Sequence, residues 1–266
     1  MRIIAGEFRR RVLLSPPDDK TTRPIPDRVK ESVFSILRGH FEGATVFDGF
    51  AGTGAIGLEA VSRGASKCLL VEQDRAMARL LTQNVENLGA GDRCEVLTAD
   101  ALGPGALARA PRPLHLAFLD PPYPMTRDPL GRRRIMAQLA ALVDLLDPEG
   151  FAVLRTPWPL FDQPEPEDAA ADDEPRPRKG RKPTGNTPVD EEPEDEEEEW
   201  FEPDEVEKLI EESGAEQPPP AGAPAPPLKR HRPIADLALP NAAGPETHLY
   251  RGMAVHLYAK KRAGEG

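Results

Sequence analysis

The sequence contains few aromatic residues, only two cysteines and no long apolar run. A membrane-spanning helix needs roughly 20 consecutive apolar residues, and no stretch of the chain approaches that length. The N-terminus, MRIIAGEFRRR, lacks the apolar core of a signal peptide. These absences predict a cytoplasmic protein with no membrane partner.

Cys68 and Cys94 lie in strand-like apolar stretches and do not form a CxxC pair. Metal and redox sites built from cysteine use closely spaced pairs, often with histidines nearby. We therefore expect two reduced thiols, no disulfide and no metal site.

Proline and acidic residues are abundant, and one segment concentrates both. Residues 160–227 hold 23 of the 45 acidic residues but only 6 of the 34 basic ones, which leaves 28 basic and 22 acidic residues elsewhere. The segment includes DEEPEDEEEE and QPPPAGAPAPP, so it has too little apolar surface to offset its ordering entropy. It is predicted to be a disordered insertion, and the folded remainder is predicted to be basic.

Outside that segment, strand-like and helix-like patterns alternate, which is typical of a parallel sheet covered by helices. The expected strands are ATVFDGF, KCLLVEQ, CEVLTAD, LHLAFLD and GFAVLRT, and ETHLYRGMAVHLYAKK is expected to close the sheet as an antiparallel hairpin. The fold class is therefore α/β, with a doubly wound, mostly parallel seven-stranded sheet.

A small extension is predicted ahead of this sheet. RIIAGEF and RVLLSP suggest a β-hairpin, and DRVKESVFSIL a helix capped by Asp27, with basic or polar residues facing outward and an inward face of Val29, Val33, Ile36 and Leu37. The expected organisation is an extension at residues 1–41, a core at 42–159, the insertion at 160–227 and completing strands at 228–266.

The first strand runs into a glycine-rich turn that opens a helix, DGFAGTG. Gly52, Gly54 and Gly57 spell GxGxxG, and Glu72 follows twenty residues later, as in a dinucleotide-binding fold. A nicotinamide dehydrogenase is therefore one alternative. Asp48 ahead of the glycines would repel a diphosphate but attract an amine-bearing cation such as S-adenosyl-L-methionine.

Asp100 closes the third strand and could accept a hydrogen bond from an adenine amino group, while Glu72 could take ribose hydroxyls. Each acid alone could be a solvated strand end or a helix cap. Three acids at three successive strand ends form a site.

The fourth strand ends in the corner Asp120-Pro121-Pro122-Tyr123. Neither proline has a backbone N–H, so the corner offers acceptors: the Asp120 carboxylate and the Pro121 carbonyl. Two adjacent acceptors match an exocyclic NH2 group, and Tyr123 could stack on the base that carries it. The alternative is a rigid turn that only ends the strand.

With DGFAGTG and DPPY together, the sequence resembles the S-adenosylmethionine-dependent amino-methyltransferases, whose fold is the Rossmann-like class I fold. The blocks MRIIAGEFRRRVL and RPIPDRVKESVFSIL are similar to the start of the bacterial 16S rRNA guanine-N2 methyltransferase family. The resemblance covers about residues 1–157 and, more weakly, the last twenty-odd. The sequence departs from the family at Arg10, where glycine is common, at Ile25, where threonine is common, and in the acidic insertion.

The resemblance implies three sets of site residues. S-adenosyl-L-methionine would contact Asp48, Phe50, Gly52, Thr53, Gly54, Glu72 and Asp100. The catalytic corner would be Asp120, Pro121, Pro122 and Tyr123. The substrate side would include Arg10, Arg23, Asp27 and Arg28.

The expected partner is 16S rRNA, in the small ribosomal subunit or an assembly intermediate, and the expected state is a monomer. Candidate phosphate contacts are Arg9, Arg10, Arg11, Arg23, Arg28, Lys30 and the run Arg132 to Arg134; a solvated basic face is the alternative for these residues. DPPY alone also fits adenine-N6 methyltransferases of DNA or RNA, and a non-catalytic RNA-binding module is a further alternative.

Overall fold

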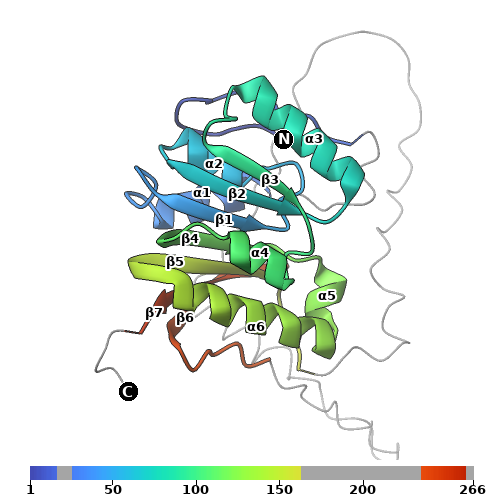
Figure 1. Ribbon diagram of the computed structural model, residues 1–266. Helices are drawn as coiled ribbons and strands as arrows, with labels where there is room; N and C mark the ends of the chain where they lie inside the picture. Colours follow the sequence, from blue (N-terminus) through green and yellow to red (C-terminus); the bar gives the residue numbers. More distant parts are fainter. Residues whose placement is uncertain (17–25, 163–234, 262–266) are drawn as a thin grey trace, which may run out of the picture. The chain divides into compact units, whose positions relative to one another are not determined.

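A seven-stranded sheet in the order β3-β2-β1-β4-β5-β7-β6 forms the centre of the protein (Figure 1). The computed structural model describes residues 1–16, 26–162 and 235–261. Its elements are α1 (Asp27–Ile36), β1 (Thr45–Gly49), α2 (Gly57–Ser62), β2 (Lys67–Glu72), α3 (Arg75–Leu88), β3 (Cys94–Thr98), α4 (Pro104–Arg109), β4 (Leu114–Leu119), α5 (Tyr123–Arg127), α6 (Pro129–Leu145), β5 (Leu146–Pro157), β6 (Ala242–Tyr250) and β7 (Met253–Lys260).

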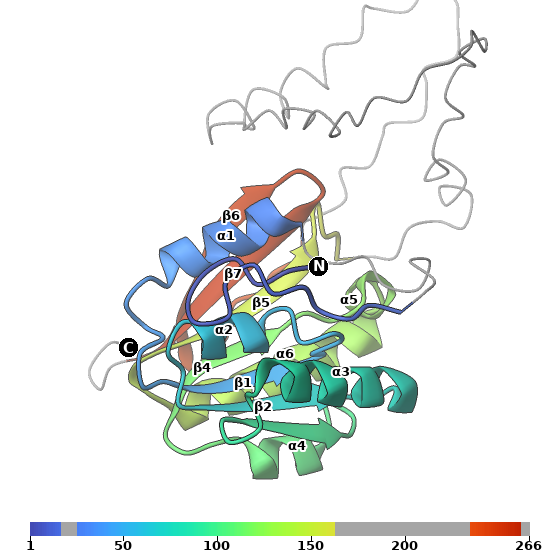
Figure 2. The same cartoon turned by 90° about the horizontal axis from the view of Figure 1, so that it is seen from above.

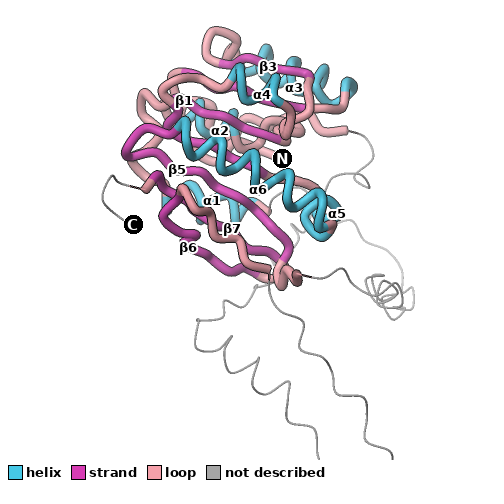
Figure 3. The backbone as a smooth tube through the Cα atoms, turned by 60° about the horizontal axis from the view of Figure 1, so that its bottom comes forward, coloured by secondary structure: helices cyan, strands magenta, loops and turns pink. Residues whose placement is uncertain are grey.

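The first five strands pair in parallel, and the last two are antiparallel to their neighbours. Figure 3 shows the β6–β7 hairpin beside β5 at the edge of the sheet. The turn of this hairpin lies at Arg251 and Gly252, as predicted. The α/β fold class and the seven-stranded, mostly parallel sheet are therefore confirmed.

Successive residues of each strand face opposite helical layers, because side chains alternate along a strand. Val46 belongs to the core under α1, α2 and α3, whereas its neighbour Phe47 belongs to the core under α4 and α6. In Figure 1 α4 and α6 lie in front of the strands, and Figure 2 shows α1 and α2 on the side away from α4. Both faces of the inner strands β1, β2 and β4 are thus largely buried, which explains their nearly continuous apolar sequences, whereas the edge strand β3 is only partly buried.

The N-terminal segment folds back on itself through a single antiparallel bridge, Arg2 to Val12, and not as the two full strands of the predicted hairpin. The backbone of Ile3 donates to Arg11 and that of Leu13 donates to Met1, each at 2.9 Å. Ile3, Phe8 and Leu13 are buried in the core shared with α1 to α3.

The predicted α1 is correct in position but wrong in part of its inward face. Ile36 is 38% exposed, and Phe34 is buried in the core with Val29 and Val33. Asp27 is not the cap: it stands in the first turn, after Pro26. An acidic residue there still complements the helix dipole.

Lys30 was predicted on the outward face of α1 as a candidate phosphate contact, but its side chain is fully buried. Its Nζ donates to the carbonyl of Arg2 at 2.6 Å and lies 3.6 Å from Oε2 of Glu59, which is also fully buried. Glu59 in turn accepts from the backbone N–H groups of Ile4 and Ala5. Burial lowers the pKa of Lys30, and the Glu59 carboxylate opposes that effect. One ion pair therefore joins the N-terminal segment, α1 and α2.

Other differences are local. The short helices α4 and α5 were not predicted, and β5 begins four residues before the expected GFAVLRT. Asp128 caps α6 by accepting from the N–H of Gly131. Cys68 and Cys94 are paired in register on β2 and β3, and both are free thiols.

The predicted insertion lies outside the described residues except for 160–162, and so does Arg23. The domain boundaries stay predictions. Within the described ranges, no helix combines the length and the apolar composition needed to cross a bilayer.

We expect Lys30→Met to destabilise the protein by about 3 kcal/mol, because it leaves Glu59 in the interior with part of its charge unpaired. Urea unfolding measures the change, and hydrogen exchange at the amides of Ile4 and Ala5 should accelerate in parallel. Lys67→Met, at an exposed lysine, is the control. A Lys30→Met stability equal to that of the control would contradict this role for the ion pair.

A second expectation concerns His256 on β7, which is buried between the hydroxyls of Thr156 and Thr247 at 3.0 and 2.9 Å. Burial lowers the pKa of His256 to about 4. The unfolded chain binds this proton more readily than the native one, so stability is full above about pH 6.5 and is lost as the pH falls toward 4.

Between pH 7 and pH 4.5 the free energy of unfolding of the wild type should fall by on the order of 2 kcal/mol because of this histidine, and His256→Gln should remove that fall. Urea unfolding at each pH measures it. His248→Gln, on the same hairpin but partly exposed and facing Glu246, is the matched control. A wild-type pH profile in the His256 variant would show that this histidine does not titrate as its burial requires.

Candidate functional site

Four acidic residues lie at the carboxyl ends of four neighbouring strands. Asp48 is the last but one residue of β1, Glu72 ends β2, Asp100 follows β3 and Asp120 follows β4. The strand order reverses between β1 and β4, so helices leave these two strands toward opposite faces. A sheet of this kind has its ligand crevice at that switch point.

The glycine-rich turn after β1 contains three backbones with positive φ: Phe50 at 70°, Gly52 at 55° and Gly54 at 88°. A Cβ on Gly54 would lie 2.6 Å from side-chain carbons of Leu58 and Leu81, whereas a Cβ on Gly52 would meet nothing within 4 Å. Gly54 is therefore required by packing, and Gly52 presents bare backbone to open space. A bulky residue such as Phe50 at positive φ is uncommon and is typical of ligand-binding turns.

Asp48 is almost fully buried, and its two oxygens differ. Oδ2 accepts from the N–H of Gly57 at 2.8 Å. Oδ1 is buried without a hydrogen-bond partner among the described residues. Burial, together with the nearby carboxylates of Asp120 and Glu72, raises the pKa of Asp48 to about 7, although the hydrogen bond from Gly57 opposes the rise. A buried acceptor in a cluster of negative charge fits a cationic donor, such as an ammonium group.

Glu72 and Asp100 both have part of their hydrogen-bonding capacity occupied. Glu72 accepts from the N–H of Gly52 at 2.9 Å and from that of Asp74 at 2.7 Å, so it holds the glycine turn in shape. Asp100 accepts from the N–H of Leu102 at 2.9 Å and pairs with Arg134 of α6 at 2.7 Å. A carboxylate has about four acceptor sites, so each acid retains capacity for a ligand.

The Asp120 corner is fixed to the neighbouring strand and to its own helix. The N–H of Asp120 donates to the carbonyl of Gly49 at the end of β1, and the carbonyl of Pro122 accepts from Met125 in α5. Pro121 is buried, Pro122 is exposed and Tyr123 begins α5 with a half-buried ring. The corner therefore lies directly beside the glycine turn.

Arg155 of β5 belongs to this corner, although the sequence did not single it out. Its Nε donates to Oδ1 of Asp120, and its guanidinium carbon lies 5.5 Å from the centre of the Tyr123 ring. Burial raises the pKa of Asp120, and the Arg155 charge opposes that rise. The available signal was a single basic residue in the otherwise apolar strand GFAVLRT.

The N-terminal segment lies against the glycine turn. The side chain of Asn84, on α3, bonds both backbone groups of Leu14 and also donates to the carbonyl of Thr53 at 2.9 Å. The hydroxyl of Thr53 donates to the sulfur of Met1 at 3.6 Å. Asn84 is 1% exposed and was also missed, because its partners are distant in sequence.

The predicted substrate-side residues are placed unevenly. Arg10 is exposed at a φ of 68° and Arg28 is exposed on α1, whereas Asp27 faces Arg2 at 3.4 Å. Lys30 is buried and is not a phosphate contact. The candidate phosphate contacts Arg132 and Arg134 pair with Asp162 and Asp100, respectively.

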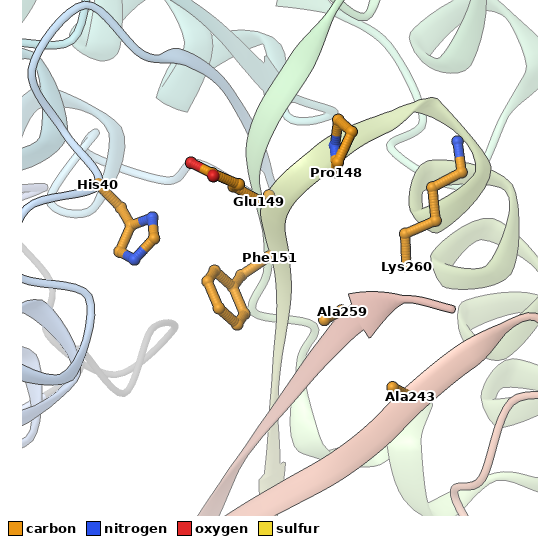
Figure 4. Close-up of a pocket in the computed structure, with 8 residues that line it drawn as sticks. His40, Pro148, Glu149, Phe151, Ala243, Ala259 and Lys260 are labelled. Carbon is orange, nitrogen blue, oxygen red and sulfur yellow. The ribbon is translucent and has the colours of Figure 1, made fainter. Parts of the chain in front are cut away.

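A cleft of about 470 Å³ opens at the other end of the sheet (Figure 4). It is lined by His40 and by residues at the start of β5 and the end of β7, including Phe151 and Lys260. His40 contacts His115, which contacts Asp147, at 3.2 and 2.7 Å. The four acids lie at the opposite ends of the strands, so this cleft is not part of their site. Within the described ranges, no group of three or more metal-binding side chains converges.

Solved structures share this fold. A structure from Escherichia coli that is named as a methyltransferase aligns with a TM-score of 0.56 at 24% identity over 98% of both chains. One from Haemophilus influenzae, named as a methylase, aligns with a TM-score of 0.52 at 21% identity, again over 98% of each chain. The protein therefore has the fold of the class I methyltransferases.

Residues 1–166 match the family described as Conserved hypothetical protein 95, and the chain belongs to this family. It is 41% identical over 123 residues to the ribosomal RNA small subunit methyltransferase D of Escherichia coli strain K12. That match covers 46% of this chain and 60% of the relative. YlbH of Bacillus subtilis, named as an rRNA methyltransferase, is 32% identical over 157 residues, which is 58% of this chain and 80% of that protein.

The buried Asp48 yields a test on the ligand-free protein. Its pKa is raised above the unfolded value, so its contribution to stability is full below about pH 4 and is lost as the pH rises toward 7. Asp48→Asn should remove this loss. As the pH rises from 5.5 to 7.5, the free energy of unfolding of the variant should increase by about 2 kcal/mol relative to that of the wild type.

Urea unfolding across that pH range measures the difference, and Asp92→Asn at an exposed position is the control. If wild type and Asp48→Asn changed in parallel with pH, Asp48 would not be the strained carboxylate that its burial indicates.

Proposed function

We propose that the protein transfers a methyl group from S-adenosyl-L-methionine to the exocyclic N2 amine of a guanine in 16S rRNA. The observation that carries the proposal is the adjacency of two acids with different tasks. Asp48, with one buried oxygen unsatisfied, suits a cationic cofactor, and Asp120 in its proline corner suits an amine-bearing base. The similarity to relatives named as rRNA methyltransferases supports the RNA substrate.

On the cofactor side, Asp48 would accept from the ammonium group, Glu72 from the ribose hydroxyls and Asp100 from the adenine amine. Gly52 would let the ligand approach the backbone closely, with Phe50, Thr53 and Gly54 forming the rest of the turn. When bound, S-adenosyl-L-methionine supplies a methyl carbon on a sulfonium, whose carbon–sulfur bond breaks with its electron pair remaining on sulfur.

On the substrate side, the Asp120 carboxylate and the Pro121 carbonyl would accept the two N–H groups of the guanine amine. These bonds aim the nitrogen lone pair at the methyl carbon, and Tyr123 would stack on the base and offset part of its unstacking. After the nitrogen–carbon bond forms, Asp120 is placed to receive the proton that the nitrogen releases. The corner contributes chiefly alignment, which is worth on the order of 7–11 kcal/mol in a two-reactant step.

The RNA side of the proposal rests on the exposed basic residues of the N-terminal segment and α1, namely Arg9, Arg10, Arg11 and Arg28. Phosphate contacts release counterions, so RNA affinity should fall steeply with salt. The proposed partner is the small ribosomal subunit or its assembly intermediate, which the protein would meet in the cytoplasm as a monomer. The proposal involves no metal ion and no membrane.

The test is a methyl-transfer assay with labelled S-adenosyl-L-methionine and small ribosomal subunits from a strain that lacks the enzyme, followed by nucleoside analysis. Labelled N2-methylguanosine is the expected product. Label in N6-methyladenosine would support the proposed cofactor and the proposed role of the DPPY corner, but it would show that the methylated base is adenine, which the corner also suits. Label in neither nucleoside would overturn the proposed activity.

In the same assay, we expect Asp120→Asn to lower kcat by roughly 10² to 10⁴, because the amide is a poorer acceptor and cannot take the proton. The affinity for S-adenosyl-L-methionine, measured by calorimetry, should stay unchanged. Asp48→Ala should show the opposite pattern in the calorimeter, with markedly weaker cofactor binding. A reversal of these two patterns would exchange the proposed roles of the two acids.

A further inference from the structure

Arg155 is a buried charge, and among the described residues its side chain contacts Asp120 and Tyr123 of the corner and Met253 of the neighbouring strand β7. Its side chain is 10% exposed and that of Asp120 is 16% exposed, so water screens their ion pair weakly. The guanidinium reaches Asp120 through Nε, lies over the Tyr123 ring and contacts the sulfur of Met253 on β7 through Nη1 at 3.9 Å. A planar guanidinium held by three elements has one orientation.

We propose that Arg155 is a positioning residue that holds the Asp120 carboxylate ionised and oriented for the substrate amine and fixes the Tyr123 ring beside it. This inference rests on the proposed methyl transfer, because it assigns Asp120 to the amine. Arg155 engages Oδ1 of Asp120, and we assign Oδ2 to the N–H of the guanine.

The ionised form matters because only a carboxylate is an acceptor at both oxygens. A protonated carboxyl group has one O–H donor, which would point at the amine protons and could not receive the proton that the reaction releases. Burial favours the protonated form of Asp120. Asp48, at the end of the neighbouring strand β1, is close enough for its carboxylate and that of Asp120 to repel each other, which also disfavours ionisation. Among the described residues, Arg155 is the group that opposes both effects.

The register of the sheet explains why β5 supplies this residue. Leu119 of β4 pairs with Leu154 of β5, so the next residues, Asp120 and Arg155, lie side by side where β4 ends and β5 continues. Arg155 also pairs with Val255 of β7, which fixes its backbone from the other side. The arginine is therefore built into the sheet, while the corner that it contacts is a turn.

The experiment compares the pH dependence of single-turnover methyl transfer for the wild type, Arg155→Gln and Arg155→Lys. In Arg155→Gln the acid limb of the rate profile should move up by about one pH unit or more, because a buried carboxylate has lost its adjacent positive charge. Arg155→Lys should restore the acid limb but not the full rate, since lysine keeps the charge and lacks the planar fork. Calorimetry should give the same cofactor affinity for all three.

Arg93 provides a matched control, because it also pairs with a carboxylate and lies over an aromatic ring: Glu7 at 2.7 Å and Phe8 at 5.3 Å. Arg93→Gln should leave the acid limb in place. An unmoved acid limb in Arg155→Gln, with only a lower melting temperature, would overturn the proposal and leave Arg155 a structural residue.

A titration that does not depend on turnover separates this inference from the proposed function. Carbon-13 NMR of labelled aspartate, with Asp120→Asn to assign the signal, reports the Asp120 carboxyl directly. A pKa higher in Arg155→Gln than in the wild type supports the electrostatic role even if no guanine is methylated. Equal pKa values refute it even if methylation is observed, and Arg155→Lys gives the same comparison should the glutamine variant fail to fold.

Discussion

The buried ion pair of Lys30 and Glu59 is the interaction on which the rest of the structure depends. Glu59 is the third residue of α2, the helix that begins at the end of the glycine-rich turn, and it also holds the backbone of Ile4 and Ala5. A buried pair of this kind contributes little net stability, because desolvation offsets the attraction between the charges. Its effect is to specify position: it sets where the N-terminal segment lies relative to the turn that shapes the site.

The site itself concentrates negative charge where the strand order reverses. Asp120 and Glu72 are close enough to Asp48 to raise its pKa. Asp120 pairs with Arg155 and Asp100 pairs with Arg134. Among the described residues, Asp48 and Glu72 have no such basic partner, and they lie beside Gly52, where bare backbone meets open space. Unpaired negative charge at this position fits the cationic cofactor of the proposed function, and the paired Asp120 fits its neutral base.

The strands and the four acids could be predicted from the sequence, because both follow from local pattern: apolar runs form buried strands, and parallel strands deliver their carboxyl ends to one edge. The inward face of α1 could be predicted only in part, since the buried Lys30 depends on Glu59, which α2 supplies later in the chain. Arg155 and Asn84 could not be predicted, because their partners are 31 to 98 residues away and are brought close only by the sheet and by the returning N-terminal segment.

The chain leaves and re-enters the sheet at one point. After β5, the carbonyl of Leu160 accepts from the N–H of Ala235 at 2.8 Å, and both residues share a small apolar cluster with Leu237 and Met136. The hydrogen bond and the apolar cluster therefore hold together the two points at which the intervening sequence leaves and rejoins the fold. Since the entropy of closing a loop grows only with the logarithm of its length, the sheet is nearly indifferent to how many residues are placed there. This junction is a position at which insertions, deletions and replacements are tolerated, because β5 and β6 keep their places in the sheet.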